Sequence, residues 1–209
     1  MIIKWQYNNN GEFRREVKNT IKENNYTSID IGASMDYWSY PECKVVADAY
    51  PTKKEDVLYF NINLEDKDDW KDIREYVEKN GKFDYSICSH TLEDVFNPLE
   101  LCEILSTISK RGYIAVPSKF NEFKKLFQNK YRGNAHHKQF FDVTNEELTI
   151  YPKYSWIETD DRSDEICTKQ TEGELTLFWE GEIKPKIFGD GKPYFSDGQL
   201  INEYYNTLK

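Results

Sequence analysis

Eight residues near the start of the chain, 27–34 (TSIDIGAS), constrain the fold more than any other stretch. They form a β-branched, mostly apolar run that ends at Gly32, with the acidic Asp30 two positions earlier. Such a run is typical of a buried parallel strand, and a glycine directly after it lets the backbone approach a ligand closely. We therefore expect a parallel sheet with a ligand at the end of this strand.

A second buried strand is predicted at 44–50 (KVVADAY), with Asp48 near its end. A strand, a glycine turn and an acidic residue at the tip of the next strand form the nucleotide-binding half of an open α/β sheet. The carboxylate is suited to accept hydrogen bonds from both ribose hydroxyls of an adenosine. Only eleven residues, 33–43, separate Gly32 from this strand. That is too short for a full crossover helix, so we expect a loop or a distorted helix there.

Length and charge limit the classes of function. A chain of 209 residues fits one domain with a full-sized core. Its net charge of −9 argues against a nucleic-acid surface, because binding phosphates requires a basic face. The four cysteines form no C-x-x-C pair, and no apolar run approaches the roughly 18 residues of a membrane span. We expect a soluble, cytoplasmic protein without a membrane span, and a small neutral or cationic ligand suits this charge better than a polyanion.

Apolar periodicity predicts the remaining elements. Expected helices follow Phe13, cover 69–80, and begin at Asn97, where asparagine is a good N-cap and Pro98 suits the first helical position. Expected strands lie at 57–62, 83–88 and 113–116. After Ser118 the pattern weakens, and we expect a helix at 120–129, a helical turn at 145–148, a strand at 154–157, and an antiparallel hairpin of 174–179 with 183–187.

This alternation favours a single doubly wound α/β domain with a Rossmann-like, mostly parallel, seven-stranded sheet and an antiparallel C-terminal edge hairpin. We divide the domain into a helical lead-in (1–26), a cofactor-binding half (27–118) and a substrate-side half with closing strands (119–209).

Four segments, in this order, resemble the class I S-adenosylmethionine-dependent methyltransferases: 29–32 (IDIG), 45–48 (VVAD), 83–93 (FDYSICSHTLE) and 112–117 (GYIAVP). The most specific segment is 89–95 (SHTLEDV). Within that family the chain is similar to glycan- and sugar-modifying methyltransferases, including those of large DNA viruses and bacteria. It departs from the family in having a single glycine in the first turn, where members usually have G-x-G.

The resemblance implies S-adenosylmethionine as the cofactor and a set of residues around it. The residues implied on the methionine and ribose side are Asp30, Gly32 and Ala33. The resemblance implies Asp48 at the ribose hydroxyls, Asn61, Ile62 and Asn63 by the adenine, and Ser89 with His90 below the sulfonium.

Methyl transfer to an alcohol requires positioning and removal of the acceptor's proton. Histidine is the side chain whose ordinary pKa suits that work, and the sequence has three. We predict the order of preference His137, His90, His136 for the base, with Asp94, Glu93 or Asp142 as the alternative. No metal site is predicted, because the spacing of His136, His137, Asp142 and Glu93 fits no strong metal motif.

Aromatic residues gather in segments expected to overhang the strand ends, and aromatic faces suit the C–H face of a sugar. These residues are Tyr37, Trp38, Tyr40, Tyr131, Tyr151, Tyr154 and Trp156. The favoured function is therefore O-methylation of a sugar hydroxyl in a glycan or an activated sugar. The alternatives are methylation of another small metabolite or of a protein side chain, and a non-catalytic methyltransferase-like module. A nicotinamide-dependent enzyme is disfavoured, because the single-glycine turn lacks the G-x-G-x-x-G contacts.

Overall fold

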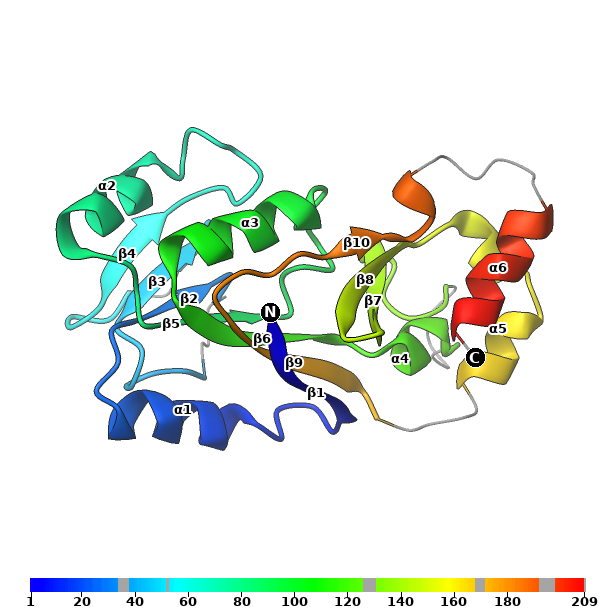
Figure 1. Ribbon diagram of the computed structural model, residues 1–209, viewed down its shortest axis with the longest axis horizontal. Coiled ribbons are helices and arrows are strands. Elements are labelled where there is room, and N and C mark those ends of the chain that lie inside the picture. The colour runs from blue at the N-terminus through cyan, green and yellow to red at the C-terminus, as the bar shows by residue number, and fades with distance from the viewer. Residues whose placement is uncertain (34–37, 52, 126–130, 168–171, 192–197, 209) are drawn as a thin grey trace.

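The computed structural model describes residues 1–33, 38–51, 53–125, 131–167, 172–191 and 198–208 (Figure 1). The larger of its two sheets has seven strands in the order β1-β9-β6-β5-β2-β3-β4. The strands are β1 (Ile2–Asn8), β2 (Ser28–Ile31), β3 (Val45–Asp48), β4 (Leu58–Asn61), β5 (Tyr85–Ser89), β6 (Arg111–Pro117) and β9 (Glu174–Glu180). Every pair from β6 to β4 is parallel. The predicted fold class is therefore confirmed.

The antiparallel end of this sheet differs from the predicted hairpin in its strands. β9 lies between β6 and β1 and pairs antiparallel with both. The chain after β9 leaves the sheet, and β10 (Lys186–Ile187) pairs parallel with β8 instead. The edge position belongs to β1, a strand that the sequence analysis placed in a helical lead-in. Its residues were not recognised because the strand has no clean alternation, with Ile3 and Trp5 both exposed.

Helices cover both faces of the seven-stranded sheet (Figure 1). On one face, α1 (Arg14–Glu23) packs Val17 and Ile21 in a cluster with Ile87 of β5. On the other face lie α2 (Lys71–Asn80) and α3 (Pro98–Ile108), and Leu105 of α3 packs in a cluster with Ile31 of β2. All three helices were predicted from periodicity. Strands with helices on both faces are apolar throughout, which is why the central strands were recognisable in the sequence.

Most of the chain after β6, apart from β9, forms a separate three-stranded sheet in the order β10-β8-β7, with helices beside it (Figure 1). Its elements are α4 (Lys119–Phe123), β7 (Gln139–Thr144), β8 (Glu147–Pro152), the 3-10 helices η1 (Ser155–Glu158) and η2 (Phe188–Gly191), α5 (Arg162–Cys167) and α6 (Gly198–Leu208).

Three predictions for this half need correction. The helical turn expected at 145–148 is the turn of the β7–β8 hairpin, where Asn145 and Glu146 have φ of 51° and 64°. Two residues with positive φ suit the tight turns of twisted hairpins. The strand expected at 154–157 is the 3-10 helix η1. The helix expected at 120–129 ends at Phe123, and residues 126–130 lie outside the described chain.

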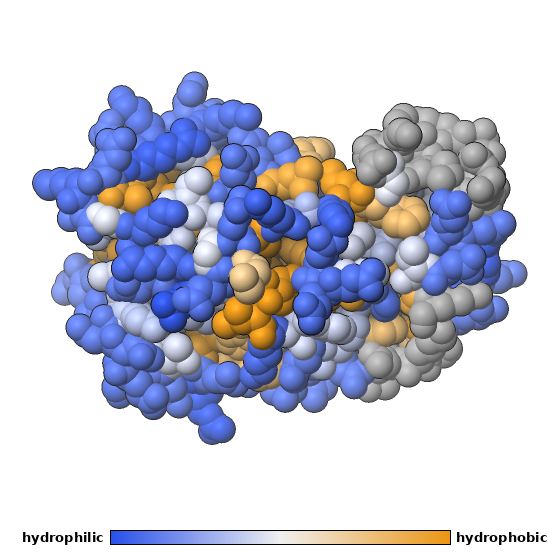
Figure 2. Space-filling view, viewed as in Figure 1, coloured by the Kyte–Doolittle hydropathy of each residue, from blue (hydrophilic) through white to orange (hydrophobic). Residues whose placement is uncertain are grey.

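None of the helices in the described part of the chain combines the length and the apolar character of a membrane span. The face shown in Figure 2 is mostly hydrophilic, with hydrophobic areas toward its middle.

Candidate active site

The strand order reverses between β2 and β5, and the turns after these two strands meet there. In open α/β sheets, ligands bind at the carboxyl ends of the strands beside such a reversal. Gly32 follows β2 with φ of 71°, and its N–H donates to the Ala47 carbonyl at 2.8 Å. A Cβ at Gly32 would lie 2.2 Å from Oγ1 of Thr91, which follows β5. Glycine is therefore required here by space as well as by φ, and Thr91 is a residue that the sequence analysis missed.

The Asp30 carboxylate lies below this turn and is buried, with 2% exposure. Its Oδ2 accepts a hydrogen bond from Ser39 Oγ at 2.6 Å. Burial raises the pKa of Asp30 to about 7; the Ser39 hydrogen bond acts against this rise and the charge of Asp48 adds to it. In this structure Asp30 ties the loop after Gly32 to the end of β2. Ala33, also expected beside the cofactor, is half-buried directly before the undescribed residues 34–37.

Asp48 and Asn61 lie side by side at the ends of β3 and β4, where they are register partners. Asp48 is half-buried, and its Oδ1 accepts from the Tyr50 N–H at 2.7 Å. Asn61 donates to the Ala49 carbonyl at 2.7 Å. Beyond them Ile62 is buried and Asn63 is exposed. The structure thus brings Asp48 and Asn61 to the same sheet edge as Gly32.

His90 follows β5, with φ of 53°, and lies between two buried glutamates. Its Nε2 is 2.8 Å from Glu174 Oε1, and its Nδ1 is 3.3 Å from Glu93 Oε1. Burial lowers the pKa of His90, but the hydrogen bonds to Glu174 and Glu93 outweigh burial and raise it to about 9. The ring is therefore charged at neutral pH, and in that state it cannot accept a proton.

Glu174 is a second residue that the sequence analysis missed. It begins β9 opposite Pro117 of β6, and its side chain is fully buried. Its Oε2 accepts from the Gly11 N–H at 3.1 Å and from Asn8 at 3.3 Å. One carboxylate therefore joins the N-terminal strand to the histidine after β5.

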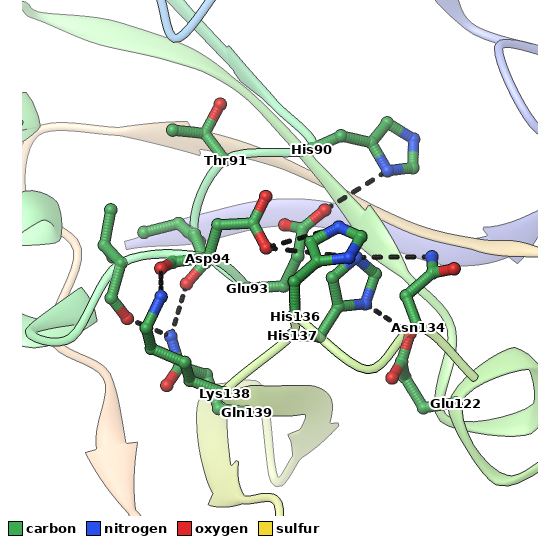
Figure 3. A network of polar contacts seen from close by, with 12 residues as sticks. His90, Thr91, Glu93, Asp94, Glu122, Asn134, His136, His137, Lys138 and Gln139 are labelled. Carbon is green, nitrogen blue, oxygen red and sulfur yellow. Dashed lines mark hydrogen bonds and ion pairs between the residues drawn. The ribbon is translucent and has the colours of Figure 1, made fainter. Parts of the chain in front are cut away.

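Asp94, His136 and His137 form a cluster beside this pair, from two separate segments of the chain (Figure 3). His136 Nε2 is 3.7 Å from Asp94 Oδ1, and His137 Nε2 is 4.0 Å from the same oxygen. The His136 side chain is 69% exposed, whereas that of His137 is 4% exposed. His137 Nδ1 faces Glu122 Oε1 at 2.7 Å. Two predicted base candidates and Asp94 thus meet at one point.

Backbone-directed hydrogen bonds hold the two segments together (Figure 3). The Lys138 N–H donates to the Glu93 carbonyl at 2.8 Å, and Lys138 Nζ donates to the Asp94 carbonyl. Gln139 Nε2 donates to the carbonyls of Leu92 at 2.6 Å and Val95 at 2.7 Å. Lys138 and Gln139 were not singled out in the sequence, because nothing local indicates contacts across more than forty residues.

Asp142 does not join the histidines. It is buried in β7, where its Oδ2 accepts from Lys119 Nζ and its Oδ1 from the Tyr7 hydroxyl, both at 2.5 Å. Several aromatic residues expected to overhang the site are also turned inward. Tyr151 is buried and stacks on Phe140 at 5.1 Å between ring centroids. Tyr154 and Trp156 pack against the same cluster, and Tyr37 lies outside the described residues.

Comparisons with known proteins give distant likenesses. No protein-family model and no curated protein matches the sequence. Among solved structures, the N-terminal domain of EvdMO1, determined in the presence of SAH and D-fucose, is 10% identical, with 83% of this chain and 84% of that one covered and a TM-score of 0.41. The plantazolicin methyltransferase BpumL, in complex with a desmethylPZN analog and SAH, is 12% identical over 83% and 84%, with a TM-score of 0.44. The methyltransferase domain of bacterial CtHen1 is 12% identical over 82% and 99%, with a TM-score of 0.43.

Proposed function

We propose that this protein is an S-adenosylmethionine-dependent methyltransferase that methylates a hydroxyl oxygen of a sugar, in a glycan or an activated sugar. The observation that carries the proposal is the arrangement of Gly32 and Asp48 at the carboxyl ends of neighbouring parallel strands, beside the reversal of strand order.

The residues at this edge fit the proposed cofactor. A side chain at Gly32 would collide with Thr91, so the glycine lets the turns after β2 and β5 pack closely at the strand ends beside the proposed cofactor site. Asp48 offers a carboxylate for two ribose hydroxyls, and Asn61 offers amide groups beside it. S-adenosylmethionine, when bound, supplies an activated methyl group on a sulfonium. The single glycine after β2 supports this cofactor over a nicotinamide dinucleotide, which requires a longer glycine-rich turn.

We assign the removal of the acceptor's proton to the cluster of Asp94, His136 and His137. His90 is charged at neutral pH, so its role is to fix the end of β5 between Glu93 and Glu174. His137 donates Nδ1–H to Glu122, which leaves Nε2 as an acceptor facing the cluster.

An exposed aromatic ring beside the cluster supports a sugar acceptor. Phe96 follows Asp94 by two residues and is 79% exposed, and Lys138 Nζ lies 4.3 Å from its ring centroid. An aromatic face flanked by a cation and carboxylates can bind both the C–H face and the hydroxyls of a sugar. Another small metabolite or a protein side chain is the alternative acceptor, and a non-catalytic module is the alternative to an enzyme.

The cofactor is tested by calorimetry with S-adenosylhomocysteine and, separately, with NAD. We expect S-adenosylhomocysteine to bind and Asp48→Ala to weaken it by about 1.5–3 kcal/mol, the usual cost of losing charge-assisted hydrogen bonds. Asp68→Asn, an exposed carboxylate before α2, is the matched control and should leave the affinity unchanged. If S-adenosylhomocysteine does not bind at millimolar concentration, the proposal fails.

The reaction is tested with a panel of deoxysugar and hexose glycosides. His137→Ala should lower turnover by about 10²–10⁴-fold, the usual size of general-base catalysis. Its S-adenosylhomocysteine affinity should stay near wild type, because a proton acceptor acts in the transition state. Cofactor binding without transfer to any glycoside would favour another acceptor or a non-catalytic module. If Ala variants of His136, His137 and Asp94 all keep wild-type turnover, the base lies elsewhere, with Glu93 the next candidate.

A further inference from the structure

Three side-chain atoms of types that bind metal ions face one another and form no hydrogen bonds among themselves. Asp94 Oδ1, His136 Nε2 and His137 Nε2 all lie within 4.8 Å of one another (Figure 3). The separations of 3.7 Å and 4.0 Å from Asp94 are too long for hydrogen bonds. Asp94 Oδ1 is also shielded from solvent and accepts no hydrogen bond from any described residue. A buried oxygen without a partner is costly, so something absent from the chain itself is expected between these atoms.

The contacts of His137 indicate which of its ring nitrogens carries the proton. Glu122 Oε1 takes the Nδ1–H at 2.7 Å, and Glu122 Oε2 is held by Lys153 Nζ at 2.9 Å. The lone pair of Nε2 therefore points toward the Asp94 side of the ring, where it accepts a hydrogen bond of 3.3 Å from Asn134 Nδ2 that a bound ion would replace. A carboxylate behind the far nitrogen of a histidine is the arrangement that orients metal-binding imidazoles.

We propose that Asp94, His136 and His137 bind a divalent first-row transition-metal cation. Such ions lie about 2.0–2.2 Å from imidazole nitrogens and carboxylate oxygens, so two ligands of one tetrahedral ion are roughly 3.3–3.6 Å apart. The distances of 3.7 Å and 4.0 Å from Asp94 Oδ1 are a few tenths of an ångström longer, so small side-chain rotations bring these atoms to the spacing of ligands of one ion. Two imidazoles with one carboxylate suit Zn²⁺, Co²⁺, Fe²⁺ or Mn²⁺, whereas Mg²⁺ and Ca²⁺ favour all-oxygen sites.

Hydrogen bonds from Lys138 and Gln139 hold the segment of the two histidines against the segment of Asp94 without an ion. Gln139 binds the carbonyls on both sides of the Glu93–Asp94 pair, and Lys138 binds the carbonyls of that pair itself. Three protein ligands leave at least one coordination position open, as in catalytic metal sites. The cation site stands on this geometry alone. Its role in activating the acceptor hydroxyl rests on the proposed methyl transfer: an ion bound here would use the lone pair of His137 Nε2, so the cation, which lowers the pKa of an oxygen that coordinates it, would replace this histidine as the activating group.

The probe is Co²⁺ added to the full, chelator-treated chain, with visible absorption and calorimetry as the readouts. We expect one Co²⁺ per chain, with an absorption spectrum typical of nitrogen and oxygen ligands. Asp94→Asn, His136→Ala and His137→Ala should each weaken binding at least 100-fold, and Glu122→Gln by about 10–100-fold as an outer partner. The matched control Asp68→Asn should bind Co²⁺ like wild type, since its exposed side chain lies outside the cluster.

The outcome that overturns the proposal is equally definite. No stoichiometric binding at millimolar Co²⁺, or binding that survives all three ligand substitutions, would mean that water bridges these atoms instead. His136 is exposed, so His136→Ala tests the site even if the buried His137 variant fails to fold. S-adenosylhomocysteine affinity measured on the same samples separates the two proposals. Cofactor binding without Co²⁺ binding overturns the cation site alone, and the reverse overturns the methyltransferase alone.

Discussion

The two sheets of this protein are stabilised in different ways. The central strands of the seven-stranded sheet bury apolar side chains against helices on both faces, as Ile31 and Ile87 do. The part of the chain around the three-stranded sheet also buries apolar side chains, such as Phe140 and Ile150, and in addition it buries charged groups in pairs, Lys119 with Asp142 and Lys153 with Glu122. Apolar burial is non-directional and tolerates small changes, whereas a buried ion pair requires both partners in fixed geometry.

This difference bears on the candidate site, because the two halves contribute different kinds of groups to it. The seven-stranded sheet supplies backbone and turn positions, with Gly32 as the clearest case. The other half supplies His136 and His137, with His137 oriented by the buried Glu122–Lys153 pair. Rigid strand ends next to directionally fixed polar side chains suit the proposed methyl transfer, which requires two reactants to be held in one geometry.

The largest effect is expected where a buried pair is broken. Asp142→Ala leaves Lys119 Nζ buried without its carboxylate and removes the partner of the Tyr7 hydroxyl. Breaking such a pair costs about 3–5 kcal/mol of unfolding free energy. Ile114→Val in the seven-stranded sheet, where the side chain is equally buried, should cost only about 0.5–1.5 kcal/mol. Urea unfolding measures both values.

A double variant separates the free energy of the lost ion pair from the cost of leaving the Lys119 charge buried without a partner. Lys119→Met with Asp142→Leu removes both charges, and it should recover most of the stability lost in Asp142→Ala. If Asp142→Ala costs no more than Ile114→Val, the contrast between the two halves is wrong.

The same contrast explains what could be predicted from the sequence. Strands buried on both faces are apolar runs, and α1 to α3 have a regular stripe, so the first half could be recognised locally. In the second half, Asn145 and Glu146 precede Glu147 and Leu148 in a pattern that resembles the start of a helix. The positive φ of the first two residues makes a hairpin turn of them, and no local propensity reveals that.

The candidate site divides in the same way. Gly32 and Asp48 could be identified because their roles follow from strand ends and turn chemistry. The partners of the histidines could not, because Glu174 lies 84 residues from His90 and Glu122 lies 15 residues from His137. Such pairs depend on how distant segments meet, and a single sequence carries no periodic signal for that.

The next largest loss of stability is expected at Gly32, where a side chain has little space. Gly32→Ala requires a residue with a side chain at φ of 71° and brings Cβ to 2.2 Å from Thr91 Oγ1. The strained backbone costs about 1–2 kcal/mol and the overlap about 1–3 kcal/mol, so we expect a loss of about 2–5 kcal/mol. Gly181→Ala is the matched control, since φ is 74° there but no described atom lies within 4 Å of the added Cβ. It should lose only the backbone part.

A substitution of Thr91 tests whether this side chain causes the loss in Gly32→Ala. Denaturant unfolding measures the free energy of each variant. Gly32→Ala combined with Thr91→Ala removes Oγ1 and Cγ2, the two nearest atoms, and should restore part of the loss. Equal costs for Gly32→Ala and Gly181→Ala would mean that the approach of Thr91 to Gly32 does not limit this turn.

The smallest effect is electrostatic and concerns His90, the group at the boundary between the two halves. Its pKa of about 9 in the folded protein exceeds the ordinary value of 6.5, because hydrogen bonds to Glu174 and Glu93 outweigh burial. The stabilisation is therefore fully present below pH 6.5 and is lost as pH rises through 9. The full shift corresponds to about 3 kcal/mol, and since a third of the ring is exposed, solvent screening reduces the expected loss to about 1–2 kcal/mol.

Unfolding free energy measured from pH 5 to pH 10 checks this prediction, with His90→Gln as the comparison. Asp30 acts in a lower window: burial raises its pKa from 3.8 to about 7, so its contribution is lost between those values and does not overlap most of the His90 window. Wild type should therefore lose stability relative to His90→Gln above pH 7, and the NMR signal of the His90 ring should titrate near pH 9. A ring that titrates near 6.5 would mean that the two glutamates do not hold the proton, and His90 would regain its place among the candidate bases.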